Sequence, residues 1–228
     1  MPTPTLAELA KMFDHSLLQP VLTDAELERG LLLAREYNVA SVCIKPYAVK
    51  LAAKLLAGST VQASTTIGFP HGGHLPGVKV YESEQALHDG ATELDMVVNI
   101  GKVLSGEWNF VASDIAGVVE VAHRAGAKVK VIFENAFLLD SHKIELCNIC
   151  GEVRADWVKT STGYAETGAT VEDLKLMRKH SPAHVQVKAA GGVRTYEKLL
   201  EVRAIGVTRV GATATKTILE EARMKLGS

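Results

Sequence analysis

Residues 128–161 read KVKVIFENAFLLDSHKIELCNICGEVRADWVKTS, and this stretch predicts the basic unit of the fold. An apolar, β-branched run at 128–135 precedes a helical pattern at 141–153, and a second short apolar run follows at 156–161. Strands that are buried on both faces have continuous apolar sequences, and a helix between two of them is typical of a parallel sheet. The stretch therefore predicts a strand–helix–strand unit with parallel strands.

The same pattern recurs along the whole chain. Further strand-like runs occupy 13–18, 40–45, 61–69, 92–100, 185–192 and 208–213, and amphipathic helices such as 23–37, 109–126 and 170–180 lie between them. The repeat is roughly 28 residues, close to the length of one strand–helix unit. Eight units predict an α/β fold, a single (β/α)₈ TIM-barrel domain over residues 1–228 with a short N-terminal helix. An open doubly wound sheet is the alternative, but the loop after 13–18 lacks its G-x-G-x-x-G turn.

Composition narrows the class of protein. The 228 residues are 47% hydrophobic and 22% charged, with a formal net charge of −1. Such a chain has no general attraction for nucleic acid or a membrane surface, so any anion must be held by a local site. The first residues, MPTPTLAELAKMFDH, do not resemble a secretory signal, and the three cysteines are an odd, low number. We expect a cytoplasmic protein.

Two lysines and an aspartate stand in apolar runs where charge is unexpected. Lys159 and Lys188 belong to consecutive predicted strands, so their side chains can converge at the C-terminal end of a barrel, where TIM-barrel chemistry occurs. One such lysine alone would be interpreted as reaching solvent. Two close ammonium groups each disfavour the charged form of the other, and the resulting free amine is the nucleophile of Schiff-base chemistry. Asp95 is either a buried counter-ion or a proton carrier, and the two roles are compatible.

Glycines suggest where an anion would bind. Gly191-Gly192 follows the seventh predicted strand and Gly211 follows the eighth, each before a helix. These two loops are the usual phosphate site of TIM barrels, because backbone N–H groups and a helix N-terminus meet there. The CxxC formed by Cys147 and Cys150 lies within a predicted helix and lacks partner ligands, so we expect a packing role and no metal.

Seven ordered segments give the chain a family resemblance. They are DHSLLQP (14–20), SVCIKP (41–46), TTIGFPHG (65–72), ATELDMVVNIG (91–101), ADWVKTSTG (155–163), VKAAGGVR (187–194) and RVGAT (209–213). Together they make the chain similar to deoxyribose-phosphate aldolases over nearly its whole length, and VKTSTG around Lys159 is the most specific of them.

The resemblance implies a class I aldolase of deoxyribose phosphate catabolism. Its reaction would cleave 2-deoxy-D-ribose 5-phosphate reversibly to D-glyceraldehyde 3-phosphate and acetaldehyde, with no metal and no organic cofactor. By position in the motifs, Lys159 would form the Schiff base. Lys188 would lower the pKa of Lys159 and help to move protons, and Asp95 would donate and accept protons with a bound water.

The same resemblance implies how the substrate is held. Gly191, Gly192, Gly211 and Thr213 would bind the phosphate, and Ser16 would lie near the sugar. The partner would be a small phosphorylated sugar, and the chain would form a homodimer or a higher homo-oligomer. Tyr164 departs from those relatives that have a phosphate-contacting lysine at this position.

Two other functions remain open from the sequence. Another Schiff-base barrel, such as a keto-acid aldolase, would need an arginine for a substrate carboxylate, and Arg194 is the candidate. A non-catalytic barrel that binds sugar phosphates would be expected to lack Lys159 or Asp95, whereas both are present.

Overall fold

Parallel strands close into a barrel in the computed structural model, which describes residues 3–227. Within those residues the eight strands are β1 (Phe13–Leu17), β2 (Ser41–Ile44), β3 (Gln62–Ile67), β4 (Glu93–Val97), β5 (Lys128–Ile132), β6 (Trp157–Lys159), β7 (Gln186–Ala190) and β8 (Arg209–Ala212). Each strand pairs with the next in chain order, and β1 closes on β8 with Phe13 opposite Val210. The predicted TIM barrel is confirmed, and the open sheet is excluded.

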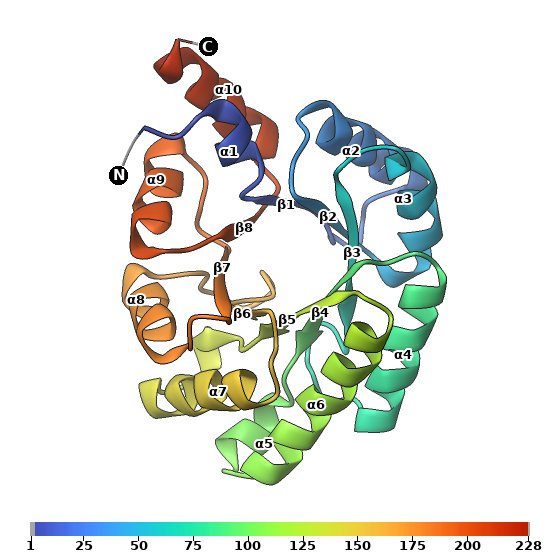
Figure 1. Cartoon of the computed structure of the whole chain (residues 1–228), viewed down its shortest axis with the longest axis vertical. Coiled ribbons are helices and arrows are strands. Elements are labelled where there is room, and N and C mark those ends of the chain that lie inside the picture. Colours follow the sequence, from blue (N-terminus) through green and yellow to red (C-terminus); the bar gives the residue numbers. More distant parts are fainter. Residues whose placement is uncertain (1–2, 228) are drawn as a thin grey trace.

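Helices form an outer ring around the strands (Figure 1). They are α2 (Asp24–Glu36), α3 (Val49–Leu56), α4 (Pro76–His88), α6 (Trp108–Arg124), α7 (Asp140–Glu152), α8 (Val171–His180), α9 (Tyr196–Ile205) and α10 (Thr215–Leu226). Shorter elements are α1 (Leu6–Ala10), α5 (Ile100–Leu104) and the 3₁₀ turns η1 (Pro46–Ala48) and η2 (Asn135–Phe137). Helix α1 is the expected N-terminal helix and packs against α10. No helix among the described residues is long and apolar enough to cross a membrane.

Local sequence fixes where two of these helices begin. The Thr23 hydroxyl accepts a hydrogen bond from the Glu26 backbone N–H, and the Glu26 carboxylate accepts one from the Thr23 backbone in return. The Thr170 hydroxyl accepts from the Asp173 backbone N–H. These caps satisfy donors that a helix N-terminus leaves unpaired, and they fall at the first residues of the predicted helices 23–37 and 170–180.

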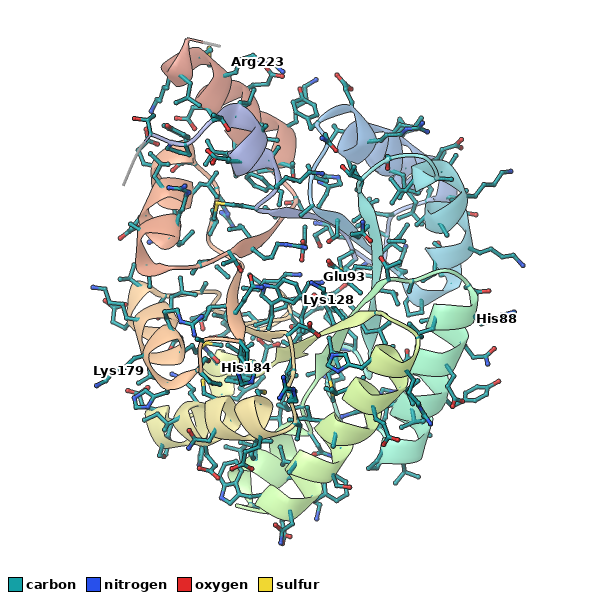
Figure 2. All side chains as sticks on the ribbon, in the orientation of Figure 1. His88, Glu93, Lys128, Lys179, His184 and Arg223 are labelled. Atoms are coloured by element: carbon teal, nitrogen blue, oxygen red, sulfur yellow. The ribbon has the colours of Figure 1, made fainter. Side chains whose placement is uncertain are left out.

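Alternation along each strand separates two interiors. In β4, Leu94 and Met96 are fully buried in the apolar layer between strands and helices. Glu93 and Asp95 point the other way, into the barrel, because successive side chains of a strand face opposite sides. Figure 2 shows Glu93 within the ring, whereas Lys179 projects outward from α8. The apolar core therefore lies outside the strands, and the inside of the barrel carries charge.

The strand bounds correct one prediction. Lys159 ends β6 and stands directly beside Lys188 of β7, as expected for neighbouring strands. Gly211, however, lies inside β8 and not in the loop after it. The reason is that β8 continues to Ala212 to pair with β1, where His15 stands opposite Ala212.

Candidate active site

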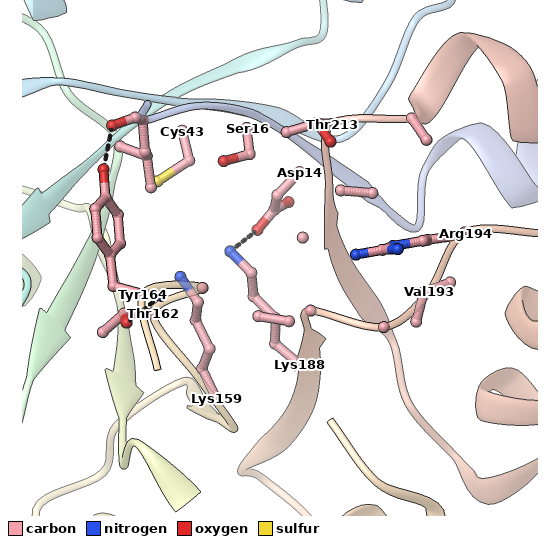
Figure 3. Close-up of a pocket in the computed structure, with 18 of the residues that line it drawn as sticks. Asp14, Ser16, Cys43, Lys159, Thr162, Tyr164, Lys188, Val193, Arg194 and Thr213 are labelled. Carbon is pink, nitrogen blue, oxygen red and sulfur yellow. Dashed lines mark hydrogen bonds and ion pairs between the residues drawn. The ribbon is translucent and has the colours of Figure 1, made fainter. Parts of the chain in front are cut away.

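A cavity of about 470 Å³ opens at the C-terminal end of the barrel. Its walls come from the ends of β1, β2, β6, β7 and β8 and from the loops that follow β1, β6, β7 and β8 (Figure 3). The predicted site residues that line it are Ser16, Lys159, Lys188, Gly191, Gly192, Gly211 and Thr213. The structure therefore brings these seven together, and Asp95 lies just beyond the cavity wall.

Asp95 connects the two predicted lysines. Its Oδ2 atom is 2.7 Å from Nζ of Lys159 and 2.7 Å from Nζ of Lys188. Asp95 is fully buried, Lys159 is 3% exposed and Lys188 is 1% exposed. The lysines converge as the neighbouring strands predicted, and one carboxylate oxygen holds both ammonium positions at the floor of the cavity.

Asp14 is a second carboxylate at this floor. Its Oδ2 atom forms an ion pair with Nζ of Lys188 at a distance of 2.6 Å, and the side chain is fully buried on β1 (Figure 3). Asp14 belongs to the motif DHSLLQP, but the sequence analysis gave it no role. Lys188 therefore forms ion pairs with two carboxylates, Asp14 and Asp95. Lys159 pairs only with Oδ2 of Asp95, the same oxygen that Lys188 contacts.

This difference separates the acid–base behaviour of the two lysines. Burial lowers the pKa of Lys159; Asp95 opposes this effect and nearby Lys188 adds to it. Burial acts in the same direction on Lys188, but Asp14 and Asp95 outweigh it and raise the pKa of Lys188 above its ordinary value. Burial therefore contributes more to the lowered pKa of Lys159 than the like charge of Lys188 does. The arrangement favours a free amine at Lys159 beside an ammonium at Lys188.

The network continues toward the other end of the barrel through residues that sequence reasoning missed. Nζ of Lys130 lies 2.8 Å from Oδ1 of Asp95 and 2.6 Å from Oε2 of Glu93. The Arg209 guanidinium donates to Oδ1 of Asp14 at 2.5 Å and to Oε1 of Glu93 at 2.9 Å. Alternation could have revealed Lys130, because the KVKV pattern of a strand buried on both faces must turn its lysines inward.

The turn after β7 forms the wall predicted to hold phosphate. Gly191 and Gly192 have φ angles of +76° and +89°, which a side chain would strain. A Cβ atom at Gly191 would also lie 2.9 Å from Cα of Gly168, in the loop after β6. Arg194 points into the cavity from the same turn (Figure 3). This wall offers close backbone and one exposed cation.

Gly211 lines the cavity and also has a packing role within β8. A Cβ atom there would lie 3.5 Å from Cε of Lys188, and the backbone of Gly211 belongs to β8. Its small size leaves room for the Lys188 side chain beside β8. Thr213, two residues later, is exposed at the cavity mouth and is placed as expected.

The opposite wall is a chain of hydrogen bonds. Glu134, buried and left-handed with φ of 58°, accepts from the backbone and hydroxyl of Thr162. The Thr162 hydroxyl accepts from the Tyr164 backbone, and the Tyr164 hydroxyl donates to the Leu18 carbonyl at 3.0 Å. The Tyr164 ring packs edge-on against Phe69. Tyr164 therefore joins the loops after β1, β3 and β6 at the cavity mouth.

Metal ligands were not expected from the sequence. Across residues 3–227, no group of three or more His, Cys, Asp or Glu side chains is arranged to hold a metal ion. Cys147 and Cys150 are buried in α7, and the Cys147 thiol contacts the Met177 carbonyl.

Known proteins share both the sequence and the fold. The chain is 60% identical over 220 residues to the deoxyribose-phosphate aldolase of Rhodopirellula baltica, which covers 96% of this chain and 91% of that protein. It is 45% identical to the deoxyribose-phosphate aldolase of Thermococcus gammatolerans, with 95% and 97% covered. The tetrameric deoxyribose phosphate aldolase of Aeropyrum pernix superposes with a TM-score of 0.86 at 29% identity, covering 98% of this chain and 94% of that one.

The resemblance inferred from the seven motifs is therefore confirmed. A family model described as DeoC/LacD family aldolase matches residues 9–213, which include every strand of the barrel. The buried lysine pair and every residue that lines the cavity, except Ala214, lie within this matched region. The chain belongs to the DeoC/LacD family of aldolases.

Proposed function

We propose that this aldolase reversibly cleaves 2-deoxy-D-ribose 5-phosphate to D-glyceraldehyde 3-phosphate and acetaldehyde through a Schiff base on Lys159. The observation that carries the proposal is the buried Lys159 amine at the cavity floor, 2.7 Å from Asp95 and with a lowered pKa. The aldolases to which the chain is 60% and 45% identical take their name from deoxyribose phosphate, which supports this substrate.

Bond formation begins with the neutral amine. Nζ of Lys159 adds to the aldehyde carbon C1 of the open-chain sugar, and loss of water leaves a protonated imine. The C2–C3 bond then breaks: its electron pair passes into the imine to give an enamine, the C3 hydroxyl gives its proton through a water to Asp95, and glyceraldehyde 3-phosphate departs. Protonation of the enamine at C2 and hydrolysis release acetaldehyde and restore the amine.

Two neighbours are proposed to manage the protons. Lys188 remains an ammonium beside the reacting nitrogen, because Asp14 and Asp95 raise its pKa. Burial alone would raise the pKa of Asp95, but Lys130, Lys159 and Lys188 together hold it well below its usual range. We infer that Lys188 donates the proton that C2 of the enamine takes up. Asp95, which orients the Lys188 ammonium, then passes the proton it received from the C3 hydroxyl to Lys188, so that both groups are restored.

The phosphate is assigned to the wall opposite Tyr164. Gly191 and Gly192 line the cavity, and Thr213 adds a hydroxyl at its mouth. Arg194 points toward the same space and supplies the positive charge that the chain as a whole lacks. We assign Ser16, which lies on β1 and lines the cavity, to a sugar hydroxyl.

Borohydride trapping tests the proposal. We expect reduction in the presence of acetaldehyde to leave a stable secondary amine on Lys159, located by peptide mass mapping, because an imine is reduced and an amine is not. Lys159→Ala should lose cleavage of the sugar phosphate by several orders of magnitude, since the covalent route disappears. An adduct on Lys188 in the wild-type protein would overturn the assignment.

Assembly, location and domain extent are also proposed. A tetrameric relative supports a homo-oligomer. The cysteines Cys43, Cys147 and Cys150 are all free and buried, which supports the reducing cytoplasm. One continuous apolar core around the barrel supports a single domain over 1–228.

A further inference from the structure

The barrel interior surrounds Lys159 with equal numbers of positive and negative groups. The carboxylates are Asp14, Glu93 and Asp95, and the cations paired with them are Lys130, Lys188 and Arg209. We propose that Glu93 and Arg209, which do not line the cavity, are positioning residues whose opposite charges set the protonation of Lys159: Arg209 favours the free amine and Glu93 favours the ammonium. The inference rests on the proposed Schiff-base function of Lys159.

Arg209 does not line the cavity, so it can affect Lys159 only through the carboxylates that it contacts. Its guanidinium bridges Asp14 and Glu93, and its central carbon lies 5.0 Å from the centre of the Trp157 ring. The Arg209 side chain is 14% exposed, and the Glu93 side chain is 4% exposed. Both are therefore removed from most of the solvent, where charges interact more strongly than they do at a surface.

The balance decides which lysine is neutral. Uncompensated charge is costly in a buried space, so three carboxylates stabilise three cations well and a fourth poorly. Lys130 and Lys188 each contact more than one carboxylate, whereas Lys159 contacts only an oxygen of Asp95 that Lys188 also uses. Lys159 is therefore the cation that gives up its proton and becomes a neutral amine.

Removing Arg209 would redistribute these pairs. Asp14 would then neutralise Lys188 and Glu93 would neutralise Lys130, since neither carboxylate would be shared with a guanidinium. Asp95 would be left to stabilise an ammonium on Lys159. Removing Glu93 has the opposite effect on the charge of Lys159. It leaves one positive charge in excess, which disfavours an ammonium on Lys159.

Among residues 3–227, the other groups near Lys159 form no ion pair with this network. They are Cys43 on β2, Ser64 on β3, Glu134 after β5 and Arg194, which is exposed in the turn after β7. Burial raises the pKa of the Cys43 thiol to about 11, so this thiol is neutral at ordinary pH. Ser64 does not titrate, and Glu134 is bound by the backbone and hydroxyl of Thr162.

The test is the pH dependence of imine formation. Initial rates of reductive trapping with acetaldehyde are measured across pH for the wild type, Arg209→Met, Glu93→Gln, the double variant and Arg209→Lys, with the adduct mapped to Lys159. We expect the acidic limb to move up by about one pH unit in Arg209→Met and down by a similar amount in Glu93→Gln. Arg209→Lys and the double variant should return close to the wild-type profile.

Arg29→Met provides a matched control, because Arg29 is exposed on α2 and its loss should leave the profile unchanged. Single variants that trap more slowly with an unmoved profile would overturn the inference, since a merely structural role lowers the rate without shifting the limb. If Arg209→Met does not fold, Glu93→Gln alone decides the test. An acidic limb that does not move down in this variant would overturn the inference. A wild type that gives no Lys159 adduct would instead contradict the proposed function.

Discussion

At the scale of single residues, Asp95 divides its two oxygens among three lysines. Oδ1 binds Lys130, and Oδ2 binds Lys159 and Lys188, all within 2.8 Å. Asp95→Asn keeps the volume but loses the charge that orients the Lys188 ammonium. We expect imine formation to persist in part, while proton transfer to the enamine slows by about a hundredfold or more.

Proton exchange measures that step directly. The methyl hydrogens of acetaldehyde exchange with deuterated water through the enamine, and NMR follows their loss. Ser64→Ala is the control, because Ser64 donates to Oδ1 of Asp95 at 3.3 Å without carrying charge. Wild-type exchange in Asp95→Asn would remove Asp95 from the proton-transfer path.

At the scale of elements, two loops support each other beside the cavity. The Ala169 backbone N–H donates to the carbonyls of Ala190 and Gly191, which fastens the loop after β6 to the turn after β7. Gly192→Val would force a β-branched residue to φ of +89° and would bring its Cβ 3.4 Å from the Ala169 carbonyl. The turn must then move away from the proposed phosphate.

The expected result is a loss of discrimination and not of imine chemistry. In the wild type, kcat/KM for deoxyribose 5-phosphate should exceed that for deoxyribose by about 10²- to 10⁴-fold, from two or three charge-assisted hydrogen bonds. Gly192→Val should reduce this ratio at least tenfold and leave trapping by acetaldehyde nearly unchanged. Gly77→Val, where a side chain meets open space, is the control. An unchanged ratio in Gly192→Val would place the phosphate elsewhere.

The elements themselves were predictable because their signals are local. Apolar runs marked the strands, and Thr23 and Thr170 marked helix starts through contacts three residues away. Helix α5 and the exact end of β8 were not predicted, because the extent of β8 depends on pairing with β1 at the far end of the chain. That pairing is why Gly211 belongs to a strand.

The site was predictable in part for a related reason. Lys159 and Lys188 stand on adjacent strands, so their meeting follows from strand order. Glu93 and Arg209 are 116 residues apart and meet only when the barrel closes, so no local pattern marked them as partners. Sequence alone also could not rank burial above like-charge repulsion as the cause of the lowered Lys159 pKa.

At the scale of the whole molecule, His15 makes the stability of the closed barrel depend on pH. It is buried on β1, and its Nδ1 atom lies 2.9 Å from the hydroxyl of Thr215, the first residue of α10. Burial lowers the pKa of His15 to about 4, whereas an unfolded histidine titrates near 6.5. Between these values the unfolded chain binds more protons, so stability falls as the pH falls, by up to about 3 kcal/mol from this residue.

His15→Asn should remove that contribution while keeping a hydrogen-bonding side chain opposite Thr215. As the pH is lowered from 6.5 to 4, we expect the free energy of unfolding to decrease less steeply for this variant than for the wild type. Urea titrations at several pH values measure this slope, with His88→Asn on the surface of α4 as the control. Parallel slopes for wild type and His15→Asn would show that the buried imidazole does not govern the acid sensitivity.

The bridge between Glu93 and Arg209 also bears on how such a sequence can diverge. Each of these two buried charges is tolerated because the other is present. A lineage that loses one of them therefore carries an unpaired buried charge until the other is also replaced. Descendants should therefore retain both residues or replace both. Positions 93 and 209 would then vary together across relatives, whereas exposed charges such as Arg29 would drift independently.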